Sequence, residues 1–430
     1  MYPRNKSLLP GIKLGVIVKD TCDNPLHAGE QAVDLFQGFM YRKVKNMHKE
    51  IVCTNDTVKN IVGIIGAQTS EVTLEVARLG RLFRVPQVSY LATAVVLSDK
   101  KKFPYFFRTV PSDTFQAKAM IEVIKEFGWN YVSVVHTETD YGTTGYEALV
   151  KHAAKEKNLC LADPLVIHDN NYEDVITKLQ ANTMTKVVVV FADRKPAGEL
   201  LEAAKRKNAL KFIWVGSDAW ASRESVVYGR EEVVRGAIAL QPLRRQLPGF
   251  NKYFNNLSER SSDSEEMNPR NPWYTEYYKT YCNCSNKEED EDLNISMCPF
   301  NNKRPKRIHQ VQQPYIHFVR DAVYVFAHAL HNLWKDTCNN TQGMCPGFQE
   351  KAFHQLKDYL HGVNFFDVDM FPFKFEEKTQ DGPPRYSIIS YVERDGIYDW
   401  KEVGTYQNGK IRNMDSTFNA TIRSESKKKH

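Results

Sequence analysis

The amino-acid sequence predicts an α/β fold in which helices cover parallel β-sheets, and two observations lead to this expectation. From Ile12 to Gln241, short β-rich runs alternate with amphipathic helical patterns, in units of roughly 30 to 40 residues that are typical of βαβ winding. The run Lys186–Ala192 is apolar on both faces, as expected for a central parallel strand between two layers of helices.

The individual elements follow in order along the chain. Further strands of the same kind are predicted at 61–66, 131–135 and 212–215. An apolar stripe predicts a helix at Asp113–Phe127, with Ser112 or Asp113 as its cap and Gly128 as its stop. Other amphipathic helices are predicted at 29–44, 70–83, 144–157, 172–180, 197–207 and 315–334, and a β-rich end at 386–406. The pattern breaks at 258–311, where we expect an insertion tethered by cysteines.

The composition excludes several classes of protein. With 430 residues and 42% hydrophobic content, the chain is long enough for roughly two or three domains. The excess of 58 Lys and Arg over 52 Asp and Glu is small for this length, so we expect no nucleic-acid binding. No window approaches the roughly 20 consecutive apolar residues of a membrane span, and Met1–Lys13 lacks the apolar core of a signal peptide.

Cysteines and glycosylation motifs indicate a secretory environment. The cysteines include two closely spaced pairs, Cys284 with Cys298 and Cys338 with Cys345. Asn-x-Ser/Thr tripeptides occur at Asn5, Asn55, Asn256, Asn283, Asn294, Asn339 and Asn419. Several of these lie in or beside the cysteine-bounded loops, which favours an oxidising compartment over a cytosolic thiol protein. We therefore expect a fragment of a secretory-pathway protein that lacks both ends.

The most informative candidate site is the segment Gly63-Ile-Ile-Gly-Ala-Gln-Thr-Ser70, where a strand ends in a small-residue turn that opens a helix. Free backbone N–H groups and the helix dipole favour an anion at such a turn. The hydroxyls of Thr69 and Ser70 are donors suited to a carboxylate. The alternative is that Ser70 serves only as an ordinary helix cap.

Further polar groups follow other predicted strands. The segment 88–93 offers the hydroxyl of Thr93 and a backbone edge that includes Leu91, and ligands of open α/β sheets bind at such carboxyl ends. The segments 136–142 and 215–220 end strands of the following domain. There Asp218 is suited to pair with an ammonium group, and the ring face of Tyr141 to attract the same cation. The alternative for Asp218 is another helix cap.

Templates for common enzymes are missing. The sequence has no Gly-x-Ser-x-Gly elbow, no Gly-x-x-x-x-Gly-Lys-Ser/Thr loop and no His-Glu-x-x-His motif. His328 and His331 are close enough to share one side of a helix, but no carboxylate partner is evident, so we expect hydrogen bonding rather than a metal. Cys282 and Cys284 lack the second pair that a zinc site requires. We expect neither enzymatic activity nor a cofactor.

Several segments, taken in order, resemble the metabotropic glutamate receptors, which are class C G-protein-coupled receptors. They are Gly-Ala-Gln-Thr-Ser-Glu-Val, Val-Pro-Gln-Val-Ser-Tyr, Leu-Ser-Asp-Lys, Thr-Val-Pro-Ser-Asp-Thr-Phe-Gln-Ala-Lys-Ala-Met, Trp-Asn-Tyr-Val-Ser-Val-Val-His-Thr-Glu, Asp140-Tyr-Gly, Gly216-Ser-Asp-Ala-Trp, Arg270-Asn-Pro-Trp273, Ala327–His331 and Val403-Gly-Thr-Tyr406. The resemblance covers essentially the whole chain. It implies two doubly wound lobes joined by a hinge, as in the periplasmic amino-acid-binding proteins. Lobe 1 would comprise 1–107 and 242–384, and lobe 2 would comprise 108–241 and 385–430.

The resemblance also implies which residues bind the ligand between the lobes. Ser70 and Thr93 match family residues that hold the α-carboxylate and ammonium from lobe 1, where Thr69 and Leu91 also lie. Asp218 and Tyr141 match those that close on the ammonium from lobe 2, with Asp113 nearby, and Asp193 matches an acidic position of the same lobe. A zwitterion held by both lobes would favour the closed form and so produce the signal.

One departure from the family concerns the ligand's side chain. Tyr315 stands where the family has the lysine that contacts the side-chain carboxylate of glutamate, and the N-terminal segment with another such basic residue is absent. A tyrosine hydroxyl forms a neutral hydrogen bond, about half as strong as a charge-assisted one. The resemblance therefore implies an α-amino acid as ligand without specifying glutamate.

The cysteines match the family in part. The resemblance implies disulfides between Cys284 and Cys298 and between Cys338 and Cys345. It also implies that Cys22, Cys53 and Cys160 pair with cysteines outside this chain, whereas Cys282 is extra.

The leading hypothesis is the extracellular ligand-binding region of a plasma-membrane receptor, present here without its signal peptide and transmembrane segments. It would form a homodimer through helices at 30–40 and 72–83 and act on a G protein through a membrane domain absent from this chain. The alternatives are a soluble amino-acid-binding or decoy protein, an orphan receptor with a ligand other than glutamate, and a pseudo-receptor with an inactive cleft.

Overall fold

The structure is a computed structural model of the 430-residue chain. It describes residues 8–48, 61–254, 312–313, 315–418 and 422, together with 273, 276–277, 280, 284–285 and 296–297. The chain divides into two compact units, one formed by 1–6 and 246–316 and the other by 7–245 and 317–430. In the first unit, β10 (Cys284–Ser285) pairs in parallel with β11 (Ser296–Met297). Most of the predicted insertion at 258–311 lies outside the described residues.

The second unit contains a three-stranded parallel sheet in the order β1 (Ile64–Ile65), β2 (Gln87–Ser89) and β3 (Phe106–Arg108). Successive side chains of a strand point to opposite faces. Accordingly Phe106 packs with residues of α2 (Ser70–Phe83) and η1 (Val95–Ser98), whereas Phe107 packs with α11 (Ile316–Cys338) and α12 (Phe348–His361). Helices therefore cover both faces of this sheet.

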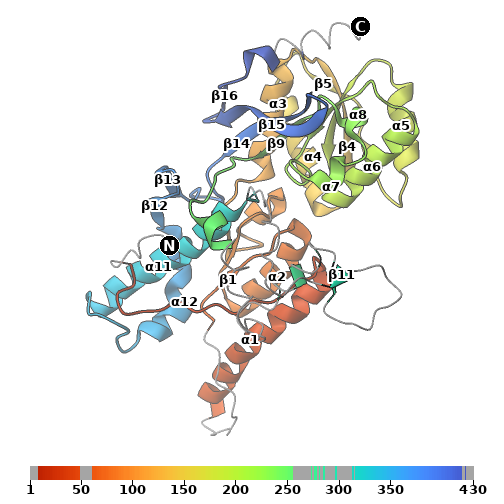
Figure 1. The fold of residues 1–430 in the computed structure, drawn as a ribbon. Helices are drawn as coiled ribbons and strands as arrows, with labels where there is room; N and C mark the ends of the chain where they lie inside the picture. Colours follow the sequence, from red (N-terminus) through yellow and green to blue (C-terminus); the bar gives the residue numbers. More distant parts are fainter. Residues whose placement is uncertain are drawn as a thin grey trace. The chain divides into compact units, whose positions relative to one another are not determined.

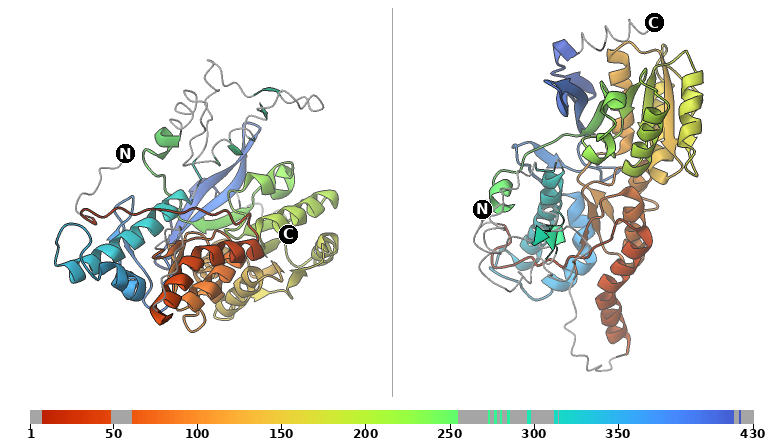
Figure 2. Two further views of the ribbon diagram at one scale, coloured as in Figure 1. Left: turned by 90° about the horizontal axis from the view of Figure 1, so that it is seen from below. Right: turned by 45° about the vertical axis from the view of Figure 1, so that its right-hand side comes forward.

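Two further elements pack around the three-stranded sheet. The first part of α1 (Pro25–His48) lies along α2, as the ribbons in Figure 2 show from two sides. Ala28, Ala32 and Phe36 of α1 pack with residues of α2. The antiparallel pair β12 (Asn364–Phe366) and β13 (Pro372–Lys374) joins the core of α11 and α12. Among the described residues, no helix combines the length and the apolar character that crossing a bilayer would require.

A second, nine-stranded sheet lies in the same unit (Figure 1). Its parallel part comprises β4 (Tyr131–Thr137), β5 (Cys160–Leu161), β6 (Leu165–Ile167), β7 (Val187–Phe191), β8 (Ile213–Gly216) and β9 (Ile238–Pro242). Three antiparallel strands extend it beyond β9, namely β14 (Arg385–Arg394), β15 (Ile397–Gln407) and β16 (Lys410–Arg412). Asp395 and Gly396 join β14 to β15 with φ of 53° and 78°, the left-handed conformation that a two-residue hairpin turn requires.

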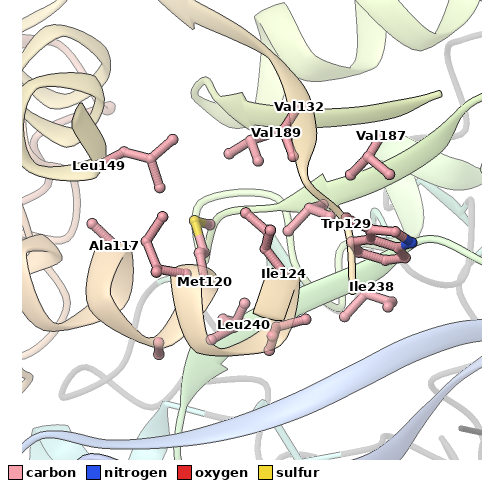
Figure 3. Close-up of a cluster of buried hydrophobic side chains, with 14 of the residues drawn as sticks. Ala117, Met120, Ile124, Trp129, Val132, Leu149, Val187, Val189, Ile238 and Leu240 are labelled. Carbon is pink, nitrogen blue, oxygen red and sulfur yellow. The ribbon is translucent and has the colours of Figure 1, made fainter. Parts of the chain in front are cut away.

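The valine run of β7 separates two hydrophobic cores. Val187 and Val189 pack with α3 (Asp113–Glu126) and α4 (Asp140–Ala153), and Figure 3 shows Val189 facing Met120 and Ile124 of α3. Val188 and Val190 pack with α5 (Tyr172–Ala181), α6 (Arg194–Arg206), α7 (Glu224–Val227) and α8 (Glu231–Val234). The run is thus buried on both faces, as predicted.

The predicted helices are confirmed, with corrections at their ends. Helix α2 has the predicted bounds, and α3 begins after Ser112, whose Oγ accepts a hydrogen bond from Thr114 N at 3.3 Å. The predicted start of α4 at residue 144 is wrong, because the Thr139 hydroxyl accepts from Gly142 N at 3.2 Å and begins the helix at Asp140. The strand predicted at 61–66 is confined to Ile64–Ile65.

The cysteine predictions have separate outcomes. The disulfide between Cys338 and Cys345 is confirmed, with 5.5 Å between the two Cα atoms. The pairing of Cys284 with Cys298 involves a residue outside the described part of the chain, as do the expectations for Cys53 and Cys282. Cys22 and Cys160 are exposed free thiols.

Candidate ligand-binding pocket

A pocket of about 1430 Å³ lies in the second unit. It is formed at the carboxyl ends of strands from the three-stranded and the nine-stranded sheet and at the first turns of α2, α4 and α6. This is the position that open α/β sheets commonly use for ligands. Its lining includes most of the residues predicted from the sequence, namely Thr69, Ser70, Leu91, Thr93, Tyr141, Asp193 and Asp218. Asp113 is fully buried and does not line the pocket, and Tyr315 is buried in the other unit.

Hydroxyl groups on the first side of the pocket connect the start of α2 to the loop after β2. Ser70 Oγ accepts a hydrogen bond from Ala94 N at 3.1 Å, and both Ser70 and Thr93 are buried. The helix cap is Thr69 rather than Ser70, and the Thr69 hydroxyl donates to Asp23 Oδ1 at 2.9 Å instead of capping. Ser70 is therefore not the ordinary cap that the sequence left open.

Buried polar side chains hold the backbone turns behind these hydroxyls. Ser89 Oγ donates to Ala67 O at 2.9 Å and accepts from Ala92 N at 3.0 Å. Gln87 Nε2 donates to Gly66 O at 2.8 Å. Because Gln87 and Ser89 belong to β2, the strand itself fixes the turn before α2 next to the loop that carries Thr93.

The second side of the pocket carries a buried tyrosine and carboxylate. The Tyr141 hydroxyl donates to Asp218 Oδ1 at 2.9 Å, and Asp218 N donates to Gln116 Oε1 at 3.4 Å. Asp218 lies in the turn after β8, and α7 begins only at Glu224. The alternative that Asp218 caps a helix is therefore wrong.

Carboxyl groups that line the pocket, together with Asp113 buried behind its wall, lie in a poorly solvated environment. Burial raises the pKa of Asp218, and burial together with repulsion from Asp218 raises the pKa of Asp113 well above its ordinary value. Burial, with repulsion from Glu71 and Asp218, raises the pKa of Asp193 to about 6. Desolvation penalises the charged form of each group. A cation placed among these carboxylates would therefore be favoured.

The raised pKa of Asp193 predicts that its ionised carboxylate lowers the free energy of unfolding, by an amount that depends on pH. Between the ordinary pKa of 3.8 and the folded value of about 6, the folded protein binds a proton more readily than the unfolded chain, so stability falls as the pH rises through this window. Asp193→Asn is expected to raise the free energy of unfolding by about 2 kcal/mol at neutral pH and by almost nothing near pH 3.5. Urea unfolding at both pH values measures the change in the free energy of unfolding, and the exposed Asp163→Asn serves as the control. An equal gain at both values would contradict it.

The histidine pair of α11 has ordinary partners. His331 Nδ1 accepts a hydrogen bond from Leu9 N at 3.2 Å. The His328 ring stacks on Phe365 with 5.1 Å between the ring centroids. The contact of His331 agrees with the expectation of hydrogen bonding, whereas the contact described for His328 is ring stacking.

Sequence reasoning missed several residues that line the pocket. Asp23, Glu71 and Arg223 contribute charged groups. Asp23 and Arg223 lie in loops without a recognised motif, whereas Glu71 lies in the Gly-Ala-Gln-Thr-Ser-Glu-Val segment, of which only Thr69 and Ser70 were predicted to bind a ligand. The apolar run at 14–18 also lines the pocket and forms no strand. The signal available was the apolar character of Leu-Gly-Val-Ile-Val, and it does not identify a pocket wall.

Comparison with known proteins supplies the wider context. Residues 3–394 match the family described as receptor family ligand binding region. The chain is 34% identical over 412 residues to metabotropic glutamate receptor 4 of Mus musculus, covering 93% of this chain and 44% of that receptor. It is 32% identical over 417 residues to metabotropic glutamate receptor 8 of Homo sapiens, covering 94% of this chain and 45% of that receptor. The chain thus spans less than half the length of these relatives.

Proposed function

Because this chain belongs to the family of receptor ligand-binding regions, we propose that its pocket binds an L-α-amino acid, glutamate or a related one. The similarity to metabotropic glutamate receptors extends over almost the whole chain. It supports the ligand-binding region of a class C G-protein-coupled receptor. It also supports a binding role rather than an enzymatic one.

The observation that carries the proposal is the placement of complementary groups around one pocket. Hydroxyls of Ser70 and Thr93 and the amino end of α2 offer donors to a carboxylate. Asp218, held by the Tyr141 hydroxyl, offers a buried anion to an ammonium group. A free α-amino acid carries both charges on adjacent atoms, so it can satisfy both sides together.

The proposed signal is closure of two lobes. We assign 1–107 and 242–384 to lobe 1 and 108–241 and 385–430 to lobe 2. The three-stranded sheet uses segments of the first set apart from Arg108 at the end of β3, and the nine-stranded sheet uses mainly the second set. Ser70 and Thr93 then belong to lobe 1, and Tyr141 and Asp218 to lobe 2. A ligand bound to both stabilises the closed state by its differential affinity.

The wider assembly is proposed on the same basis. Leu26 and Val33 of α1 and Leu82 of α2 are exposed apolar side chains, which supports a homodimer formed through these two helices. We place the protein on the extracellular side of the plasma membrane, with a G protein as the partner of the remainder of the receptor. The ligand's side-chain contacts would not rely on a lysine, because Tyr315 occupies the corresponding position.

Calorimetry with a panel of amino acids on the complete ectodomain tests the proposal. At least one L-α-amino acid is expected to bind, and its analogue lacking the α-amino group is expected to bind more than about tenfold more weakly, because the carboxylates would be left without a cation. The D-enantiomer serves as a control for geometry. If no α-amino acid binds, the proposed ligand class is wrong.

A further inference from the structure

A buried arginine outside the pocket contacts the loop that carries Thr93. Arg108 is the last residue of β3 and is fully buried. Its Nη1 donates to Ala92 O and to Ala94 O, each at 3.0 Å. These two carbonyls belong to the residues on either side of Thr93. We call residues 92–94 the Thr93 loop.

The guanidinium group is itself anchored on its other edge. Its Nε donates to Asp381 Oδ1 at 2.6 Å, and its Nη2 donates to Ser98 Oγ at 2.6 Å. Ser98 Oγ in turn donates to Asp381 Oδ2 at 2.7 Å. A buried cation is tolerated only when it is paired and hydrogen-bonded, and Asp381, which is also buried, meets this requirement.

Other bonds account for most of the remaining backbone groups of the Thr93 loop. Ala92 N donates to Ser89 Oγ at 3.0 Å, and Ala94 N donates to Ser70 Oγ at 3.1 Å. Thr93 O accepts from Asp113 N at 2.9 Å. Arg108 is the side chain that bonds both other carbonyls, and Ala94 O also accepts a longer bond from Leu97 N at 3.3 Å. One side chain therefore joins the two ends of the loop.

We propose that Arg108 is a positioning residue for ligand recognition, holding Thr93 at the pocket wall by clamping the carbonyls on both sides of it. The inference rests on the proposed function, since it assumes that Thr93 contacts the ligand. A planar guanidinium group can span two carbonyls and a carboxylate in one plane, whereas the compact ammonium group of lysine cannot. Arg108 touches no ligand in this scheme and acts only through the loop.

The clamp also connects the pocket to a distant part of the chain. Asp381 belongs to a segment that pairs with the end of β3, because Arg108 N donates to Gln380 O at 3.2 Å and Gly382 N donates to Val110 O at 3.0 Å. This segment leads directly into β14. The position of Thr93 is therefore set jointly by β3 and by the chain that enters the larger sheet.

The test compares Arg108→Lys with a matched variant, Arg230→Lys. Arg230 is likewise paired with a carboxylate and bonded to a backbone carbonyl, with Nε on Glu202 Oε2 at 2.8 Å and Nη1 on Val226 O at 3.1 Å. Its side chain is partly exposed, and neither of these two partners lines the pocket. Both variants are expected to lower the unfolding temperature. Only Arg108→Lys is expected to weaken amino-acid binding in calorimetry, by about tenfold, because hydrogen bonds to charged groups are lost at the loop.

A second measurement does not require a ligand. Hydrogen exchange at the amides of Ala92 and Ala94 is expected to accelerate by about tenfold or more in Arg108→Lys and to stay unchanged in Arg230→Lys. If Arg108→Lys does not fold, Ser98→Ala removes one anchor of the guanidinium group and is expected to give the same pattern with a smaller amplitude. Unchanged exchange, or full affinity in Arg108→Lys, would overturn the inference. Absence of binding by the parent protein would instead refute the proposed function, while exchange would still test the clamp.

Discussion

Replacing Asp218 by asparagine is expected to weaken binding of an α-amino acid by about 100-fold, because truncating one partner of a buried charge pair costs about 2–5 kcal/mol. The amide can still accept the hydrogen bond that Tyr141 donates at 2.9 Å, so the pocket wall is preserved and only the charge is removed. Calorimetry on the complete ectodomain measures the loss. A variant that binds as tightly as the parent would show that Asp218 does not hold the ammonium group.

The stability of the same variant separates lost binding from misfolding. Burial raises the pKa of Asp218, and its charge also raises the pKa of the neighbouring Asp113, so the ionised carboxylate disfavours the folded state without ligand. The unfolding temperature of Asp218→Asn is therefore expected not to fall. A matched control is Asp174→Asn, which removes an exposed carboxylate paired with Lys178 at 2.7 Å. This variant should change neither the affinity for the amino acid nor the unfolding temperature appreciably.

Gly382→Ala is expected to lower the free energy of unfolding by about 4 kcal/mol or more, among the largest effects of a single substitution. A Cβ at this position would lie 2.0 Å from Thr109 O and 2.4 Å from Thr109 C. These are backbone atoms and cannot rotate away. The segment would have to separate from β3, with loss of the 3.0 Å bond from Gly382 N to Val110 O. Urea unfolding of the purified ectodomain measures the change.

The control for this variant is another glycine-to-alanine change, at a buried position with room for a Cβ. At Gly198 in α6, an added Cβ would lie 3.9 Å from its nearest neighbour, Val226 Cα. Gly198→Ala is expected to stabilise the protein by about 0.5–1 kcal/mol, because alanine is the better helix former. Similar behaviour of the two variants would mean that the approach of Gly382 to Thr109 is not tight.

The elements that sequence patterns predicted best are those with local causes. Helices α2 and α3 have an apolar stripe and polar residues at their starts, so their bounds were predicted almost to the residue. The start of α4 was missed because the Asp-Tyr-Gly-Thr stretch contains poor helix formers, and the cap at Thr139 outweighs them. The first strand was predicted too long, because apolar character alone does not show where pairing stops.

The pocket could be predicted in part for a similar reason. Ser70, Thr93, Tyr141 and Asp218 all follow strands, and the rule that ligands bind at the carboxyl ends of strands was enough to single out each segment. That the four residues face a common site was implied by the resemblance to the receptor family. The clamp on the Thr93 loop could not be predicted, since Arg108 and Asp381 are 273 positions apart in sequence. Neither could the pKa of Asp193, because it depends on burial and on the approach of Glu71.

The antiparallel extension of the larger sheet has a consequence for the order of synthesis and folding. Strand β14 pairs with β9, residue Tyr386 with Pro242 and Ser390 with Ile238, and Tyr386 and Ile388 complete the core around α3. Until β14 has been synthesised, the edge of the sheet formed by β9 has no partner strand and the apolar side chains of β9 stay uncovered. Contacts between distant parts of a chain form slowly, and the folding intermediates that precede them expose apolar surface and are prone to aggregate. A nascent chain stalled before β14 should therefore depend on chaperones to stay in solution.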